Sequence, residues 1–234
     1  PPPPPPPPPH FFFYIHTPED PILSCLVGSE MCIRDRVEEY DLSTHPNLKD
    51  FIDHINNNGK NNPHSLAVNG VSSHGGWDPL QDEVSHPMLF AFQQCLDEYT
   101  DKAGYWPAML SGSWYNILPK GGFTHRHRHE GSVLSGAFYW DLPEGDHGNL
   151  YMISPLVPYK MCETHLMQTP YTYYEFDVPI KNNHLYIFPS WLEHGSRVNN
   201  TDQDRFTVSF NTVPFPTEYM DEERLLKVKG KKVK

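Results

Sequence analysis

Three histidines alternate with two arginines near the middle of the chain, and this spacing suits metal binding. The stretch reads Thr124-His125-Arg126-His127-Arg128-His129-Glu130. Alternate residues of a β-strand share one face, so His125, His127 and His129 would project together. Neutral imidazole is the commonest protein ligand for borderline first-row metals, and two histidines two residues apart can hold one ion. The same pattern also fits a solvated edge strand that merely alternates His and Arg.

A further histidine stands where a second strand would begin. The run Phe188-Pro189-Ser190-Trp191-Leu192-Glu193-His194 contains the end of an apolar strand, a proline turn and the entry to the next strand. If this strand packs beside residues 123–129, His194 completes a facial set of three ligands. Such a set leaves open positions on the metal for a cosubstrate and oxygen, as in iron(II) oxygenases. Taken alone, His194 would more simply cap its turn.

A third motif places an arginine on the polar face of a strand. The run Arg205-Phe206-Thr207-Val208-Ser209-Phe210-Asn211 alternates polar and apolar side chains, so Arg205 and Thr207 face the same side. If that side is a barrel interior, the arginine is costly to bury without a carboxylate. Its planar guanidinium suits a bidentate carboxylate ligand, and a neighbouring hydroxyl adds a bond. The alternatives are pairing with an internal Asp or Glu, or a place on the solvent face.

The elements that position these motifs divide into a helical part and a β-rich part. An apolar face after Pro46 predicts one helix near 46–55, and a second is expected over 86–102 before Gly104. Between them, to about residue 84, we expect a loop. From residue 105, aromatic and β-branched runs alternate with turn signals and predict strands near 109–117, 123–129, 133–141, 149–153, 172–178, 184–189, 193–198 and 205–213. Eight short strands favour a sandwich, jelly roll or barrel.

Composition excludes several classes of protein. The chain has 234 residues, and 18 Lys and Arg against 29 Asp and Glu give a formal charge of −11. This charge argues against nucleic acid or an anionic membrane surface as the main partner. No apolar run approaches the roughly 18 residues that a membrane span needs. Outside the first 36 residues, Cys95 and Cys162 form no metal-like or redox-like spacing, which favours a cytoplasmic protein.

The first 36 residues differ from the rest. Pro1 to Pro9 is an unbroken proline run, and the stretch from Ser24 to Arg36 resembles translated sequencing adapter. We expect 1–36 to be a non-native or disordered leader fused to a protein truncated at its start. A genuine proline-rich arm is the alternative. The remainder predicts a single domain at 37–218, with a helical part at 37–104 and a barrel at 105–218, and then a charged tail at 219–234.

Taken together, these motifs resemble a known family. The ordered pattern is H-x-H, Ser135-Gly136, the run that ends at His194, and Arg205 followed by Ser209-Phe210-Asn211. It is similar to the 2-oxoglutarate/Fe(II) oxygenases common in marine bacteria and their phages, over about 105–213. The resemblance implies a mainly β fold, a double-stranded β-helix (jelly roll) with the metal in its mouth and two or more N-terminal helices packed on it.

The resemblance also implies roles for individual residues. His127 and His129 match the H-x-H, and His194 matches the distal metal histidine. Arg205 matches the basic residue that salt-bridges the distal carboxylate of 2-oxoglutarate, and Thr207 is its expected hydroxyl partner.

Other positions fit the family pattern less closely. His125 has no counterpart in it and is interpreted as a residue that supports the metal ligands from behind or lies on the surface. The wider superfamily carries a carboxylate where His129 stands, so Glu130, a water or a shift to His125 and His127 could supply that ligand instead. Asn116, on the preceding strand, is a weaker candidate for contact with the cosubstrate.

The activity that the resemblance implies is an Fe(II)- and 2-oxoglutarate-dependent dioxygenase. It would use O2, hydroxylate an unidentified substrate and release succinate and CO2. We expect a small-molecule or protein side-chain substrate, with nucleic acid disfavoured, no membrane partner and a homodimer left open. The expected location is the cytoplasm of a bacterium or, for a viral protein, of its host. Two alternatives are a cupin-type metal enzyme that does not use 2-oxoglutarate and a catalytically inert phage structural or interaction protein.

Overall fold

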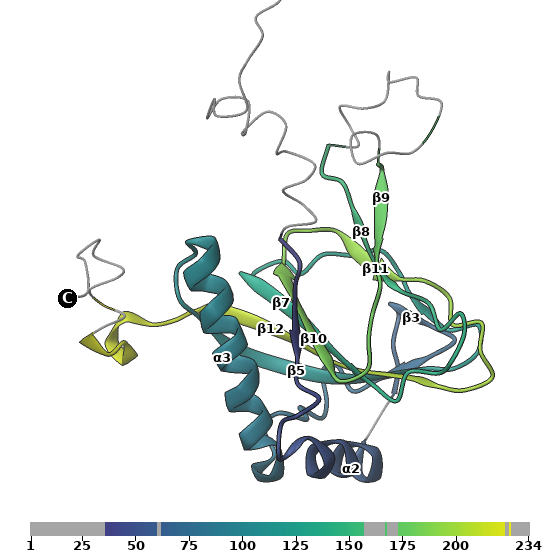
Figure 1. Cartoon of the computed structure of the whole chain (residues 1–234), viewed down its shortest axis with the longest axis horizontal. Coiled ribbons are helices and arrows are strands. Elements are labelled where there is room, and N and C mark those ends of the chain that lie inside the picture. Colours follow the sequence, from purple (N-terminus) through teal and green to yellow (C-terminus); the bar gives the residue numbers. More distant parts are fainter. Residues whose placement is uncertain (1–35, 60–61, 157–166, 168–172, 223–224, 226–234) are drawn as a thin grey trace, which may run out of the picture.

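The helices and strands are known for most of the chain. The computed structural model describes residues 36–59, 62–156, 167, 173–222 and 225 (Figure 1). The helices are α2 (Leu48–Asn58), α3 (His86–Ala103) and the single 3-10 turns η1 (Glu83–Ser85) and η3 (Thr217–Tyr219). The strands are β1 (Glu38–Asp41), β2 (Asn62–Pro63), β3 (Ala67–Val68), β4 (Val71–Ser72), β5 (Ala108–Leu118), β6 (Phe123–Thr124), β7 (Leu134–Trp140), β8 (Leu150–Ile153), β9 (Glu175–Val178), β10 (His184–Pro189), β11 (His194–Ser196) and β12 (Arg205–Pro214). The expected leader up to residue 35, Cys162 and most of the expected tail lie outside the described residues.

Two antiparallel sheets form the body of the protein. The large sheet has the order β1-β10-β7-β12-β5-β4-β2, and the small sheet has the order β11-β8-β9. Strands β3 and β6 form a separate two-stranded pair. Just after β6, an isolated antiparallel bridge between His127 and His194 connects the chain to β11 of the small sheet. From β5 onward the chain passes repeatedly between the sheets, and Figure 1 shows β8, β9 and β11 lying together, away from both helices. The prediction of a mainly β, antiparallel fold is confirmed.

The structure differs from the predicted elements at three places. The predicted strand 123–129 is regular only over β6, because the backbone N–H of His125 bonds to Leu66 while that of His127 bonds to His194. The chain therefore leaves one neighbouring strand for another within three residues. The predicted loop before residue 84 contains β2, β3, β4 and η1, and β1 was not expected. Strands of two residues are too short to show an alternating pattern.

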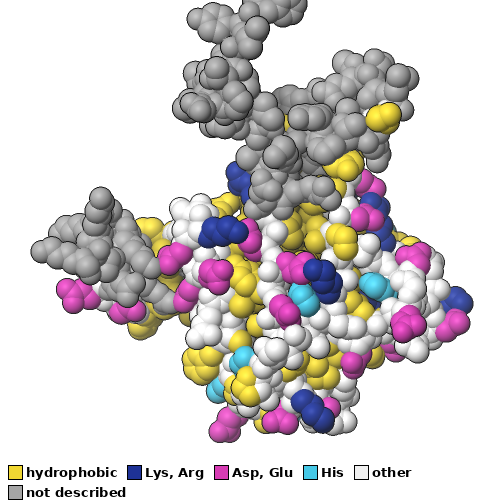
Figure 2. Space-filling model, viewed as in Figure 1, with side chains coloured by type: hydrophobic (Ala, Val, Ile, Leu, Met, Phe, Trp, Pro, Cys, Tyr) yellow, Lys and Arg dark blue, Asp and Glu magenta, His cyan; other side chains and the backbone are white. Residues whose placement is uncertain are grey.

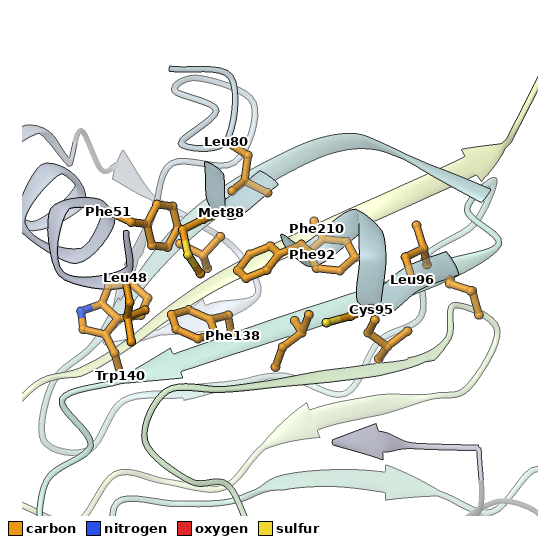
Figure 3. Close-up of a cluster of buried hydrophobic side chains, with 14 of the residues drawn as sticks. Leu48, Phe51, Leu80, Met88, Phe92, Cys95, Leu96, Phe138, Trp140 and Phe210 are labelled. Carbon is orange, nitrogen blue, oxygen red and sulfur yellow. The ribbon is translucent and has the colours of Figure 1, made fainter. Parts of the chain in front are cut away.

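Aromatic rings fill the space between the helices and the large sheet. Phe51 of α2 and Phe92 of α3 both contact Phe138 of β7, with ring centroids 6.1 and 5.4 Å apart (Figure 3). Phe92 also packs against Phe210 of β12 at 5.8 Å. Because side chains alternate along a strand, this packing fixes one face of β12 toward the helices. The other face, which begins at Arg205, is left to line the interior of the barrel.

Gly136 leaves room for one of these rings. Gly136 and Phe210 are opposite one another in β7 and β12, and a Cβ atom at position 136 would collide with the Phe210 ring. We expect Gly136→Ala to lower the free energy of unfolding by about 1–3 kcal/mol, as overpacking of a core does. Denaturant unfolding measures this. Gly112→Ala on β5 is the matched control, since a Cβ there meets nothing closer than 4.0 Å. Equal unfolding midpoints for the two variants would contradict the prediction.

The surface carries mixed charge. On the face shown in Figure 2, Lys and Arg side chains lie among Asp and Glu side chains and form no continuous basic patch over the coloured residues. Among the described residues, neither helix combines the length and the apolar character needed to cross a membrane. The cytoplasmic location and the homodimer stay predictions.

Candidate metal centre

Three of the predicted site histidines come together at one end of the small sheet. His127 and His194 exchange two backbone hydrogen bonds, of 2.8 and 2.9 Å, which places their rings side by side with centroids 4.5 Å apart. His129 lies two residues further along, with its ring 4.9 Å from that of His127 and 5.0 Å from that of His194. One ring nitrogen of each histidine lies within 4.8 Å of the others. The three imidazoles therefore form a cluster that could share one ion.

In each of the three rings, Nδ1 lies next to an oxygen atom, and this oxygen determines which ring nitrogen carries the proton. Nδ1 of His127 lies 2.7 Å from the carbonyl oxygen of His125, and Nδ1 of His194 lies 2.8 Å from that of Leu192. Nδ1 of His129 meets Oδ1 of Asn211. An oxygen acceptor requires a proton on Nδ1, so Nε2 of each ring keeps its lone pair. Metal-binding histidines are commonly oriented by an acceptor of this kind on the other nitrogen.

The electrostatics of the cluster favour neutral imidazoles. Burial lowers the pKa of all three rings below its ordinary value, and that of His129 falls to about 4. The neighbouring rings of His127 and His129 lower the pKa of His194 further. Since the metal-binding form of histidine is the neutral one, the cluster is in the ligating form at neutral pH. Three neutral nitrogen donors, one on the buried His194 and two on half-buried rings, suit a first-row divalent metal such as Fe(II).

Arg205 is buried in the interior with a donor left over. It is 1% exposed, and Nη1 donates to the carbonyl oxygens of His147 at 2.7 Å and Gly148. Nη2 donates to Ser196 Oγ at 2.7 Å, whereas Nε has no hydrogen-bond partner among the described residues. Across the described part of the chain, no Asp or Glu pairs with this guanidinium, and burial lowers its pKa. A buried, unpaired N–H is costly, so the arrangement suits a ligand carboxylate.

One cavity of about 250 Å³ joins the histidine cluster to Arg205. Thr207 is buried in its wall and lies opposite Asn116 across β12 and β5. Asn116 Nδ2 donates to Ser209 Oγ at 3.5 Å. All six predicted site residues thus line the same cavity, with the histidines on the small-sheet side and the others on the large sheet. Tyr139, whose pKa burial raises to about 12, also lines it and remains an uncharged phenol.

Two alternative ligands lie outside the histidine cluster. The His125 side chain is exposed and stacks edge-on against Phe123, 5.2 Å between centroids. His125 contributes to the site through its backbone carbonyl oxygen, which lies next to Nδ1 of His127. Glu130 is exposed and lines the rim of the cavity. The geometry therefore favours His129 over a ligand set shifted to His125 and His127.

Sequence reasoning missed two histidines at the rim of the cavity. His64 and His74 lie in the segment predicted as a loop, and both line the cavity. Ring contacts run from His64 to His74 at 5.1 Å, from His74 to Trp114 at 5.0 Å, and from Trp114 to His129 at 5.6 Å. The segment has no hydrophobic period that could have placed these residues in space.

Comparison with protein families gives one match. Residues 112–211 match the family described as "Putative 2OG-Fe(II) oxygenase". The matched region contains Asn116, the three clustered histidines, Arg205 and Thr207. None of the curated proteins matches this sequence.

Solved structures give the fold. A prolyl-4-hydroxylase from Pseudomonas putida is 16% identical, with a TM-score of 0.52, and the match covers 82% of this chain and 100% of that one. The epimerase SnoN of nogalamycin biosynthesis, described as non-heme and alpha-ketoglutarate-dependent, is 12% identical over 82% and 83% of the two chains, TM-score 0.56. HygX from Streptomyces hygroscopicus, solved with nickel and 2-oxoglutarate bound, is 13% identical over 82% and 89%, TM-score 0.52. The predicted double-stranded β-helix is the fold of this chain, and the marine and phage origin stays a prediction.

Proposed function

We propose that this chain, a 2-oxoglutarate-dependent Fe(II) oxygenase, hydroxylates a substrate that reaches the cavity past its histidine rim. In this proposal His127, His129 and His194 hold Fe(II), and Arg205 holds the far carboxylate of 2-oxoglutarate. One observation carries it: three neutral imidazoles with free Nε2 atoms share one cavity with a buried arginine that pairs with no Asp or Glu among the described residues. Bound Fe(II) would couple the oxidation of 2-oxoglutarate by O2, to succinate and CO2, to hydroxylation of the substrate.

The protein's own part in this reaction is to bind and orient. Nε of Arg205 is free to donate to a carboxylate, and the Thr207 hydroxyl on the same face of β12 can add a second bond. The Nη1 and Nη2 bonds to His147, Gly148 and Ser196 hold the guanidinium in place before any ligand arrives. Such prior ordering lowers the entropy cost of binding.

The size of the cavity limits what it can hold besides 2-oxoglutarate. Its volume of about 250 Å³ lies below the roughly 300–1,000 Å³ that is usual for ligand pockets. We infer that only the reacting end of the substrate enters, while the rest lies against His64, His74 and Trp114. A small molecule with a protruding group or a protein side chain meets this requirement. The neighbouring structures include a prolyl-4-hydroxylase and a HygX complex with hygromycin B, which agree with either class.

Anaerobic titration tests the proposed function. Fe(II) and then 2-oxoglutarate are added to the metal-free protein, and the visible spectrum is followed. We expect the weak charge-transfer band of the chelate to appear only when both are present. Absence of the band in protein that is folded by circular dichroism would contradict the proposal.

A three-histidine site gives one rival some support. A cupin-type metal enzyme that does not use 2-oxoglutarate would also employ neutral histidines. It would leave the free donor of Arg205 without a role, which is why we rank it second. Turnover of a substrate without release of succinate would favour it, and failure of the purified protein to retain iron would favour a non-enzymatic role.

A further inference from the structure

A chain of side-chain hydrogen bonds lies behind His129. Oδ1 of Asn211 on β12 faces Nδ1 of His129, and Ser135 on β7 is the cross-strand neighbour of Asn211. Ser135 Oγ lies 3.0 Å from His129 Nδ1, 3.0 Å from Asn211 Oδ1 and 2.7 Å from Ser190 Oγ. Ser190 Oγ donates in turn to Ser132 Oγ at 2.9 Å. Two polar side chains therefore contact Nδ1 of this imidazole, and two further serines extend the chain behind them.

His129 differs from the other two clustered histidines in what fixes its ring. Nδ1 of His127 and of His194 each faces a backbone carbonyl, which can only accept a hydrogen bond. His129 faces a side-chain amide, which has an oxygen at one end and an NH2 group at the other. The oxygen requires a proton on Nδ1 and leaves Nε2 free to bind a metal. The NH2 group would require the opposite tautomer, with a proton on Nε2.

The Ser135 hydroxyl favours one of these two orientations. Ser135 Oγ donates to Oδ1 of Asn211, so the amide oxygen is held between the hydroxyl and the imidazole. Ser190 lies on the other side of Ser135, with its Oγ 2.7 Å away, and Ser132 lies beyond it. Outer partners of this kind orient metal ligands and set their tautomer.

We propose that Asn211 is a positioning residue whose amide oxygen makes His129 the third metal ligand, with Ser135 fixing the orientation of the amide. This inference rests on the metal site of the proposed function. It assigns to Asn211 a task that backbone carbonyls perform for His127 and His194. It also explains how a neutral histidine can be held in a single ligating tautomer without a carboxylate beside it.

Two nearly isosteric variants of Asn211 test the proposal. Asn211→Leu removes the acceptor, whereas Asn211→Asp keeps an oxygen in either orientation and, when ionised, can only accept. Ni(II) binding to the metal-free full chain is measured by isothermal titration calorimetry at neutral pH. We expect Asn211→Leu to bind Ni(II) about 10- to 100-fold more weakly than the wild type. Asn211→Asp is expected to bind at least as tightly as the wild type.

Controls separate this role from a general effect on folding. Asn200→Leu, an exposed asparagine in the loop before β12, is expected to bind Ni(II) like the wild type. Wild-type affinity in Asn211→Leu, or equal weakening in Asn211→Asp and Asn211→Leu, would overturn the proposal.

The tautomer of His129 can also be read directly in the wild type. Nitrogen-15 NMR of the metal-free protein is expected to show the proton of His129 on Nδ1, and a proton on Nε2 would overturn the proposal. This measurement stands even if Asn211→Leu does not fold. If the wild type itself fails to bind Ni(II), the proposed function is contradicted, and the NMR result still decides whether His129 is held in the tautomer with its proton on Nδ1.

Discussion

Replacement of Arg205 by leucine is expected to weaken 2-oxoglutarate binding by about 30- to 4,000-fold. Removing one member of a buried, hydrogen-bonded charge pair costs about 2–5 kcal/mol, and each 1.4 kcal/mol is about tenfold in affinity. The effect is large because the guanidinium is buried and pairs with no Asp or Glu of the described chain, so its loss removes the positive charge that would meet the ligand carboxylate. The dissociation constant of 2-oxoglutarate from the Ni(II)-loaded protein measures the loss, and succinate release by the Fe(II) enzyme should fall in parallel.

The interpretation of Arg205→Leu needs a check on structure. The guanidinium also holds the carbonyls of His147 and Gly148, so the variant has to be shown to unfold at a similar denaturant concentration. Arg205→Lys keeps the charge but loses the planar fork, and we expect it to recover part of the affinity. Succinate release that persists undiminished in a folded Arg205→Leu protein would contradict the role of Arg205 and favour an enzyme that does not use 2-oxoglutarate.

The second large effect is expected for His194→Ala. His194 is the only cluster member on β11 and is bridged by its backbone to His127, so its loss leaves two ligands on one segment. We expect Ni(II) affinity to fall by more than about 100-fold, beyond the range seen for outer partners of metal ligands. Isothermal titration calorimetry of the metal-free variant measures this, and succinate release should disappear with the metal.

His125→Ala is the matched control for His194→Ala. It removes an imidazole from the same histidine-rich stretch, but that side chain is exposed and lies outside the cluster. The backbone carbonyl that orients His127 remains in the variant. We expect metal affinity close to that of the wild type. A loss as large as that of His194→Ala would show that the ligand set is shifted to His125 and His127.

The parts of the site that alternate along one strand could be predicted from the sequence. The two-residue repeat of β12 correctly separates Arg205 and Thr207 from the apolar side chains. In the histidine stretch it was only partly right, because it predicted His125 beside His127 and His129, whereas His125 is exposed and lies outside the cluster. The face of a strand is a local property that side-chain chemistry reveals. The positions of the barrel strands followed from the same repeat, and each predicted strand region contains a strand.

Contacts between distant segments could not be predicted in this way. His64 and His74 reach the cavity because two-residue strands fold back onto β5 and β6, and no periodicity marks such strands. In the sequence, Asn211 is marked only as the last polar residue of the alternating run 205–211. Its pairing with His129 depends on the register between β7 and β12, which places residues 76 apart opposite each other.

The bond between Ser196 and Arg205 has a consequence for the choice of cosubstrate. Ser196 lies two residues from His194 on β11, so both side chains point to the same face, about 7 Å apart along the strand. The strand repeat therefore sets the distance between the proposed metal and the guanidinium. A 2-oxo diacid has to span that distance with its own carbon chain. Selection for the five-carbon acid over its four- and six-carbon homologues would then follow from backbone geometry.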